Sequence, residues 1–377
     1  MQRKLLLHIG VHKTGTSAIQ RACTMNTKRL QKSGWAFANN DANIANWGNI
    51  FDFHKTDTDV HFRIPDEKMQ WLIAALSSHT SNTILSCEDL FFLGEDEIKN
   101  FAKHVEPLFD AVEICVYLRR QDELAISQKS QGAKTIQSAL VFGLEPGALP
   151  VLTKPVQEYL DFATKIETWK QAFKNATVIA REYNRPQLAS GDIVTDFFNN
   201  LDIKIKSDGA KINTSLSANE VQLLLSLRAQ GLTQADIARI GQEDWINTHT
   251  AGANPTQAQA REFLDFFAES NKNLEKVVGH PFQFHDDFSK YPEQPIETDY
   301  AKYERENLLQ LVAKLADLSS LDTARSISAV ARNIKQIRPR MALELVSIAR
   351  KMHPHAPQIG KLHAEISTVV ANMEKRT

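Results

Sequence analysis

Short apolar runs separated by longer stretches with helical spacing make up most of the first half of the chain. The apolar runs lie at residues 5–10, 83–86, 112–118 and 177–180. Each run is followed by a segment in which apolar residues recur every three or four positions, as at Met69, Leu72, Ile73 and Leu76. Buried strands that alternate with helices are typical of a parallel sheet covered on both faces. We therefore predict an α/β fold for this part.

Helical spacing extends through the rest of the chain. The helices predicted between and after the strands lie at residues 16–32, 66–79, 155–173 and 187–200. Helical spacing continues from about residue 217 to 273, and the Pro- and Asp-rich residues 280–298 indicate a linker or an extended arm. After residue 300 the pattern is all-helical, with breaks at Pro339, Pro354 and Pro357. We predict one domain at residues 1–290 and a helical C-terminal region at 291–377, in which residues 341–357 look like a single tetratricopeptide-type hairpin.

Composition indicates a folded protein that needs no covalent cross-links. The chain has 377 residues and is 42% hydrophobic, enough to bury a full core. Its three cysteines, Cys23, Cys87 and Cys115, are odd in number and lack metal-ligand spacing, which favours a reducing compartment. No stretch approaches the roughly 18 apolar residues that span a bilayer. We expect a soluble, cytoplasmic protein without a membrane span.

The charge is distributed unevenly along the chain. The formal net charge is -1, yet residues 301–377 carry 13 Lys or Arg against 7 Asp or Glu. Such asymmetry indicates an anionic partner for the C-terminal helices. The simpler interpretation is that these helices pack on the domain or on a second copy of the chain, as in a homo-oligomer.

The first strand leads into a turn rich in glycine and hydroxyl groups and then into a helix. Residues 11–17 read VHKTGTS. Backbone N–H groups and the helix dipole converge at such a helix N-terminus and bind phosphate. Gly10 and Gly15 have the spacing of the Walker A pattern, but Thr16 stands where its lysine belongs and the lysine comes earlier, as Lys13. This order fits an anion site better than an ordinary turn with helix-capping hydroxyl groups.

The displaced lysine and the residues behind it resemble the 5′-phosphosulfate loop of the sulfotransferases that use 3′-phosphoadenosine 5′-phosphosulfate (PAPS). Residues 8–10 and Gln20 are more similar to the bacterial carbohydrate-type branch of this family than to its small-molecule branch. The resemblance covers about residues 1–290 and implies a sulfotransferase domain with a P-loop-like parallel sheet flanked by helices. It also implies that the donor is held by Lys13, Thr14, Gly15, Thr16 and Ser17.

A second nucleotide motif follows the third apolar run. The family holds the 3′-phosphate with an arginine at a strand end and a serine eight residues later, and Arg119 and Ser127 match this pattern. Arginine can bind phosphate through two parallel N–H bonds. We expect the neighbouring Arg120 to be solvated, although either arginine can face the nucleotide. Lys211 and Ser215 resemble part of a segment that closes over the nucleotide in relatives.

Sulfuryl transfer needs a base for the acceptor hydroxyl and positive charge at the leaving phosphate. The second apolar run delivers Glu88 and Asp89 to its carboxyl end, the edge where ligands bind in open α/β sheets. Relatives place a glutamate or histidine there as the base, so we predict that Glu88 is the base and that Asp89 caps a helix. Lys13 is predicted to stabilise the leaving phosphate, and no metal is expected.

Five residues between the loop and the second run are candidates for the acceptor site: Trp35, Trp47, His54, His61 and Arg63. Aromatic faces and basic groups suit anionic glycans. With the resemblance, they predict in-line transfer of a sulfuryl group to a hydroxyl of a carbohydrate or glycoconjugate.

Three other classes of protein compete with this prediction. A P-loop kinase-like phosphotransferase begins in the same way, but the misplaced lysine and the lack of a paired Mg²⁺-binding aspartate argue against it. Residues 230–240 look like the start of a helix-turn-helix, yet the residues after them are acidic where a recognition helix is basic, so we expect no nucleic-acid partner. The third class is a non-catalytic interaction protein that acts through its C-terminal helices.

Overall fold

The computed structural model describes residues 2–39, 47–145, 147–207, 218–229, 254–295, 321–336 and 338–374. The chain forms two compact units. The first consists of Met1–Leu216 and Asn254–Pro295, and the second of Ser217–Ala253 and Ile296–Thr377. The predicted division at residue 290 stays a prediction.

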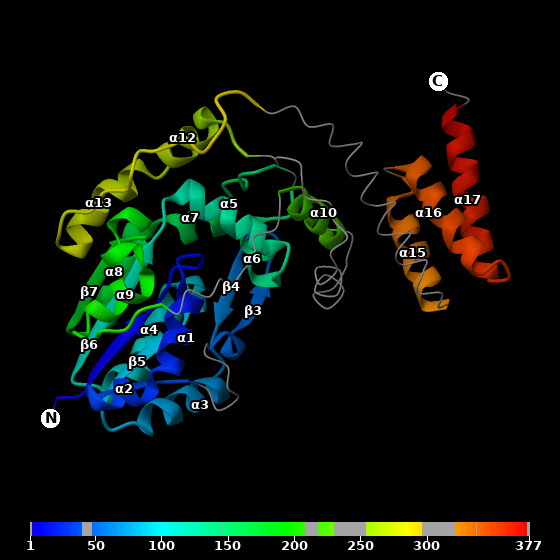
Figure 1. Ribbon diagram of the computed structural model, residues 1–377. Coiled ribbons are helices and arrows are strands. Elements are labelled where there is room, and N and C mark those ends of the chain that lie inside the picture. The colour runs from blue at the N-terminus through cyan, green and yellow to red at the C-terminus, as the bar shows by residue number, and fades with distance from the viewer. Residues whose placement is uncertain are drawn as a thin grey trace. The chain divides into compact units, whose positions relative to one another are not determined.

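Five parallel strands form the central sheet of the first unit (Figure 1), in the order β2-β5-β1-β6-β7. They are β1 (Lys4–His8), β2 (Trp35–Phe37), β5 (Asn82–Ser86), β6 (Ala111–Leu118) and β7 (Ala176–Glu182). In the middle strand, Leu7 pairs with Leu85 on one side and with Ile114 on the other. The four predicted strands are all present, whereas the three residues of β2 are too few to show a period. The predicted α/β fold class is confirmed.

Helices cover both faces of this sheet. Successive residues of a strand point to opposite faces, so each strand contributes side chains to both cores. Leu5 and Leu7 belong to a core that includes residues of α3 (Asp66–Ser77), α4 (Glu95–Val105) and α8 (Phe162–Ala172). Leu6 belongs to a second core with residues of α1 (Thr16–Met25) and α9 (Ile193–Asn199). The near-continuous apolar runs of the sequence therefore reflect strands that are buried on both faces.

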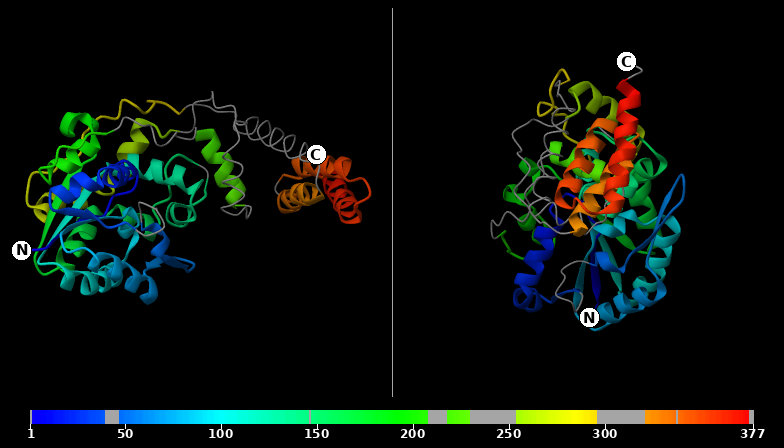
Figure 2. Two further views of the ribbon diagram at one scale, coloured as in Figure 1. Left: turned by 60° about the horizontal axis from the view of Figure 1, so that its bottom comes forward. Right: turned by 90° about the vertical axis from the view of Figure 1, so that its right-hand side faces the viewer.

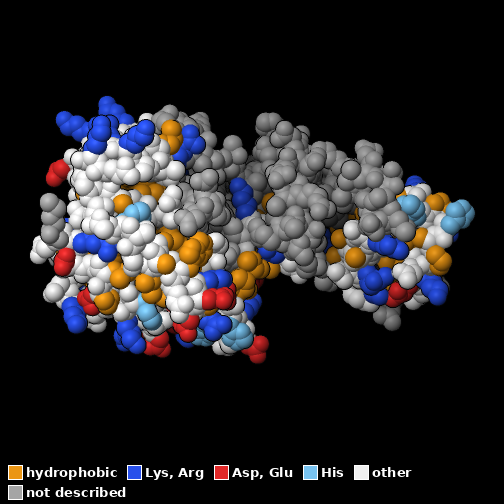
Figure 3. All heavy atoms as spheres, turned by 90° about the horizontal axis from the view of Figure 1, so that it is seen from below, with side chains coloured by type: hydrophobic (Ala, Val, Ile, Leu, Met, Phe, Trp, Pro, Cys, Tyr) orange, Lys and Arg blue, Asp and Glu red, His pale blue; other side chains and the backbone are white. Residues whose placement is uncertain are grey.

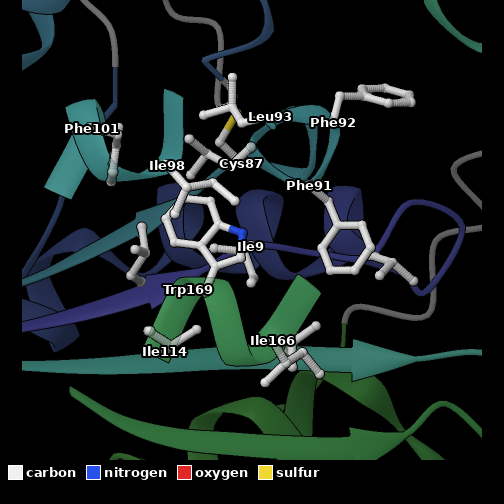
Figure 4. Close-up of a cluster of buried hydrophobic side chains, with 14 of the residues drawn as sticks. Ile9, Cys87, Phe91, Phe92, Leu93, Ile98, Phe101, Ile114, Ile166 and Trp169 are labelled. Atoms are coloured by element: carbon white, nitrogen blue, oxygen red, sulfur yellow. The ribbon is translucent and has the colours of Figure 1, made fainter. Parts of the chain in front are cut away.

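Trp169 lies at the centre of the first core (Figure 4). Its ring approaches Phe101 of α4 edge-on, with 5.6 Å between the ring centroids, and the side chains of Ile98 and Ile114 lie close by. The side chain is fully buried. Its helical spacing from Ile166 therefore indicates a core position rather than a ligand contact.

Polar residues divide two of the predicted long helices. Residues 16–32 form α1 and α2 (Thr27–Lys32), which meet at Asn26. Residues 155–173 form α7 (Lys154–Leu160) and α8, and Asp161 between them accepts a hydrogen bond from the Thr164 N–H at 3.2 Å, which caps α8.

The other elements of the first unit are short or lie outside the sheet. They are the hairpin of β3 (Asp52–Lys55) and β4 (Val60–Arg63), the helices α5 (Gln121–Gly132), α6 (Ile136–Phe142), α12 (Gln257–Asp265) and α13 (Ala268–Val278), and the 3₁₀ helices η1 (Gly48–Ile50), η2 (Glu88–Phe92), η3 (Glu106–Leu108), η4 (Arg185–Gln187) and η5 (Ala189–Gly191).

The described segment that follows α13 folds back onto the end of β6 and is anchored by Arg120. This guanidinium is buried, lies 2.7 Å from the Asp122 carboxylate and donates to the carbonyls of His285 and Asp287, both at 2.9 Å. The ring of Phe288 lies 3.9 Å from its central carbon. The expectation that Arg120 is solvated is wrong, because residues far along the chain supply its acceptors and cover it.

The described part of the second unit is all-helical, as predicted. It comprises α10 (Ala218–Ala229), α15 (Leu321–Ile334), α16 (Pro339–Met352) and α17 (Pro357–Glu374). Helix α16 packs against α15 and α17, which appear in orange to red in Figure 2. Pro339 and Pro357 begin their helices, where a missing backbone N–H leaves no hydrogen bond unmade. The tetratricopeptide-type hairpin stays a prediction.

Acidic and basic side chains share the surface. In the view of Figure 3, Lys and Arg side chains gather at one edge, and acidic, basic and histidine side chains mix along the opposite edge. Among the described helices, none has the length and apolar character needed to cross a membrane.

Candidate functional site

The loop between β1 and α1 presents backbone donors at the carboxyl edge of the sheet. Lys13 and Gly15 have positive φ angles of 63° and 85°. A Cβ atom at Gly15 would lie 2.9 Å from Ile193, so both backbone angle and space call for glycine. Thr14 Oγ1 donates to the Val11 carbonyl at 2.6 Å and fixes the turn. Among the described residues, the backbone N–H groups of 13–15 have no acceptor, and those of the first turn of α1 extend this set of donors.

Lys13 is the cation of this loop. Its Nζ donates to Gln131 Oε1 on α5 at 3.2 Å. Partial burial lowers the pKa of Lys13, and the nearby cations Lys134 and Arg119 lower this pKa further, whereas Glu88 raises it. The positive charges therefore gather where the loop N–H groups already favour an anion. The buried Thr16 and the exposed Ser17 follow in the first turn of α1.

Glu88 lies directly beside the start of this loop. It begins η2 at the end of β5, and a Cβ atom at Gly10 would come within 3.2 Å of its Cα. Gln20 of α1 donates to Glu88 Oε2 at 3.0 Å and to the Ser86 carbonyl at 3.2 Å. Burial raises the pKa of the Glu88 carboxyl, which suits a group that accepts a proton near neutral pH.

A chain of hydrogen bonds that the sequence did not reveal passes through His12. The Nε2 atom of His12 lies 3.0 Å from Asp89 Oδ1, and its Nδ1 atom lies 2.8 Å from the Tyr159 hydroxyl. Tyr159 also accepts from Gln128 Nε2 at 3.1 Å. This order leaves the Tyr159 O–H to donate to His12 Nδ1, so neutral His12 carries its proton on Nε2 and donates to Asp89.

The hydrogen bonds around His12 give Asp89 a role other than the predicted helix cap. Asp89 makes no capping bond at η2, because its carboxylate holds His12 instead. The only signal in the sequence is position: His12 precedes Lys13 and Asp89 follows Glu88. Tyr159 lies more than a hundred residues after His12 and 70 residues after Asp89, so local pattern could not join it to them.

Arg119 lies at the end of β6, half-buried, and its Nε donates to Glu123 Oε2 at 3.0 Å. Its terminal nitrogens have no hydrogen-bond partner among the described residues. Glu123 and Ser127 are four residues apart on α5 and share one face of that helix. Arg119 therefore sits beside the face that carries Ser127. Arg120 points into the fold, so Arg119 is the arginine that can meet a ligand.

A cavity of about 1110 Å³ opens next to the His12 chain. Its wall includes Tyr159 and the β3–β4 hairpin, where His54 and His61 pair across the strands. Arg63 lines the same cavity. Three of the five predicted acceptor residues thus line one cavity, and Tyr159, which is hydrogen-bonded to His12, lines it too.

The two tryptophans predicted to stack on the acceptor lie elsewhere. Trp47 is 1% exposed, and its indole N–H donates to the Ala38 carbonyl at 2.9 Å. Trp35 lies in β2 and packs in the core that contains Leu6. Neither ring has a free face for a sugar. Lys211 and Ser215 lie outside the described residues.

Metal-ligating groups do not converge in the part of the chain that the structure describes. No three His, Cys, Asp or Glu side chains there lie close enough together to hold an ion. The three cysteines are buried as free thiols.

Comparison with known proteins gives limited similarity. No protein-family model matches the chain. A protein of Archaeoglobus fulgidus, described as uncharacterized, is 29% identical over 146 residues, which are 38% of this chain and 37% of that protein. The chain thus matches little more than a third of that relative's length. The crystal structure of a sulfotransferase from Alicyclobacillus acidocaldarius is 13% identical, with 75% of this chain and 98% of that chain covered and a TM-score of 0.36. At this TM-score, the likeness does not establish a common fold.

Proposed function

We propose that this protein transfers a sulfuryl group from PAPS to a hydroxyl of a carbohydrate or glycoconjugate. One observation carries the proposal: Lys13 and Glu88 lie at the carboxyl ends of the adjacent parallel strands β1 and β5, beside a loop whose N–H groups at residues 13–15 have no acceptor among the described residues. Such a site provides a loop that can bind an anion, a cation that can meet developing negative charge, and a base. These are the three requirements of group transfer to a hydroxyl.

The residues divide the reaction between them. As the acceptor oxygen forms its bond to sulfur, the bond between sulfur and the bridging phosphate oxygen breaks. Glu88 takes the proton of the acceptor hydroxyl, and its burial makes it a better base than an exposed carboxylate. Lys13 and the loop N–H groups meet the charge that grows on the leaving phosphate. Fixed cations serve here in place of a metal ion.

Arg119 and Ser127 are proposed to hold the 3′-phosphate. The terminal nitrogens of Arg119, unpaired among the described residues, can form the two parallel bonds that a phosphate accepts. Lys211 and Ser215 stay predicted contacts of the nucleotide. The cavity beside Tyr159 is the proposed acceptor site, with His54, His61 and Arg63 on its wall.

Thermal shift with two nucleotides tests the donor site. Adenosine 3′,5′-bisphosphate (PAP) should stabilise the protein more than AMP, because only PAP carries the 3′-phosphate. A ligand at about 100 times its Kd adds roughly 2.7 kcal/mol of stability. The variant Arg119→Ala should remove the difference between PAP and AMP. Equal stabilisation of the unaltered protein by both nucleotides would refute the proposed 3′-phosphate site.

The C-terminal region is proposed to serve assembly or acceptor docking rather than chemistry. Its excess of basic residues suits an anionic partner, and its helices can pair with a second copy of the chain. Deletion of residues 296–377 should therefore leave PAP binding intact.

A further inference from the structure

A row of aromatic side chains leads from the hairpin to the phosphate loop. Phe53 contacts Phe62 with 6.1 Å between ring centroids, and Phe62 stacks on Phe92 at 4.6 Å. Phe92 in turn lies 5.1 Å from Tyr159 and 4.5 Å from His12. The four rings from Phe53 to Tyr159 all line the cavity. The row therefore connects the wall of the cavity to His12, the residue before Lys13.

Carboxylates outnumber cations on the same wall. Within the described part of the chain, seven acidic residues line the cavity: Asp52, Asp59, Glu95, Asp96, Glu97, Glu158 and Asp161. The basic side chains are Arg63, Lys154 and Lys165, together with the imidazoles of His54 and His61. Among the described residues, the lining thus carries four more carboxylates than Lys and Arg side chains. The basic residues noticed in the sequence are a minority in their own cavity.

Two of the three cations are already engaged by the protein. Lys154 bridges the hairpin to α7, because its Nζ contacts both Asp59 and Glu158. Lys165 donates to the Leu93 carbonyl at 2.7 Å, and burial lowers the pKa of its ammonium group to about 8. Of the described residues on the wall, Arg63 is the remaining permanent cation for an incoming anion.

Four of the acidic residues on the wall are ion-paired as well: Asp52 with Lys68, Glu95 with Lys99, and Asp59 and Glu158 with Lys154. Asp96 and Glu97 in the first turn of α4 make no ion pair within the described ranges. Asp161 accepts from Ser270 Oγ at 2.6 Å and from Thr164 N–H at 3.2 Å, and its charge raises the pKa of Lys165 against the effect of burial. A second negative charge beside Asp96 and Glu97 would be repelled, whereas a positive charge would gain ion pairs there and contact with the exposed ring of Phe53.

We propose that the acceptor is a hydroxylated compound that carries an ammonium group, of the class of the amino sugars, and that the cavity disfavours anionic glycans. This inference rests on the proposed function, because it names the acceptor of that same site. The ring of Phe53, which is 41% exposed, packs against the apolar face of the sugar ring, while the buried rings of Phe62, Phe92 and Tyr159 support it from behind. Asp96 and Glu97 pair with the ammonium group. Specificity follows from attraction to one charge and repulsion of the other.

Three trisaccharides with the same linkage test the proposal: one is made of glucosamine, one of glucose and one of glucuronic acid. Binding to the full chain is measured by calorimetry with PAP present, at a pH where the amine is protonated. The glucosamine trimer should bind most tightly, the glucose trimer more weakly and the glucuronate trimer weakest. Added salt should weaken only the binding of the glucosamine trimer.

A matched pair of variants assigns the effect to the cavity. The double variant Asp96→Asn, Glu97→Gln should lower the preference for glucosamine over glucose by roughly three- to tenfold, since each exposed ion pair contributes about 0.2–1 kcal/mol. The control Asp66→Asn, Glu67→Gln removes the same charges from the first turn of α3, away from the cavity, and should leave the preference unchanged.

The outcomes separate this proposal from the proposed function. Tightest binding of the glucuronate trimer, equal binding of all three, binding of none, or an unchanged preference in the double variant would each overturn the amino-sugar assignment. PAP stabilisation, measured on the same samples, reports on the donor site alone. If PAP fails to bind while the glucosamine preference depends on Asp96 and Glu97, the cavity assignment stands and the donor assignment fails.

Discussion

Replacing the adjacent residues Arg119 and Arg120 by alanine should change two different properties of the protein. Arg120→Ala removes a buried guanidinium that pairs with Asp122 and holds the returning segment through the carbonyls of His285 and Asp287. Arg119→Ala removes a half-buried guanidinium whose one partner among the described residues is Glu123. We expect the first variant to lose stability and the second to lose discrimination between nucleotides.

The size of the Arg120 effect follows from what is left behind. Asp122 is fully buried and would keep the Tyr291 hydroxyl, at 2.7 Å, as its only hydrogen-bond donor among the described residues. Removing one partner of a buried ion pair costs about 3–5 kcal/mol, because the other charge stays without compensation. The two carbonyls would also lose a donor, although such losses do not add fully. The Arg119 pair is partly exposed, so its loss should cost less than about 1 kcal/mol.

Urea unfolding followed by tryptophan fluorescence measures both variants, and thermal shift with PAP and AMP measures binding. The double variant Arg120→Met, Asp122→Asn should be more stable than Arg120→Ala, since it leaves no buried charge unpaired. If Arg120→Ala lowers the free energy of unfolding by less than about 1 kcal/mol, or Arg119→Ala lowers it as much as Arg120→Ala does, the assignment of the two arginines is wrong.

Four further predictions follow from the site. Glu88→Gln should keep PAP binding while kcat falls by about 10² to 10⁴. Lys13→Ala should lower both kcat and PAP affinity. A Glu88→Gln variant with normal turnover would place the base elsewhere. Turnover should survive EDTA, whereas loss restored by Mg²⁺ would favour a kinase-like enzyme. Burial raises the pKa of Glu123, but the bond to Lys290 and the charge of Arg119 overcome this effect and bring it to about 2. Ionised Glu123 therefore contributes on the order of 3 kcal/mol to the free energy of unfolding above its ordinary pKa of about 4.3, and this contribution is lost as pH falls towards 2. Glu123→Gln should flatten the dependence of the free energy of unfolding on pH in this range. Tyr159→Phe keeps the ring but not the bond to His12, and kcat should fall roughly two- to tenfold with PAP binding retained; unchanged turnover would make the bond structural only.

The sequence located the strands and the loop because both depend on local chemistry. A strand buried on both faces reads as an unbroken apolar run, so β1, β5, β6 and β7 were visible without any knowledge of their neighbours. The turn before α1 needs glycine at a positive φ angle and hydroxyl groups near the helix start, and these are signals of the residues themselves.

The sequence also named Lys13 and Glu88, since each follows a predicted strand. It could not show that the two strands are neighbours, because the order β2-β5-β1-β6-β7 is set by contacts between distant segments. That order alone brings a residue after β5 beside the loop after β1. Short elements were missed for a related reason: the hairpin strands have four residues each, and β2 has three.

Only the tertiary structure decided which charged and aromatic groups are accessible. Arg119 and Arg120 have nearly the same sequence context, yet one is buried because a segment some 165 residues later supplies its acceptors. Trp47 and His61 looked equally suited to a sugar, but one lies in the core and the other on a cavity wall. Burial, ion pairing and the charge of a cavity belong to sets of residues from distant parts of the chain. Local periodicity describes one segment at a time, so these properties appear only when the segments have packed together.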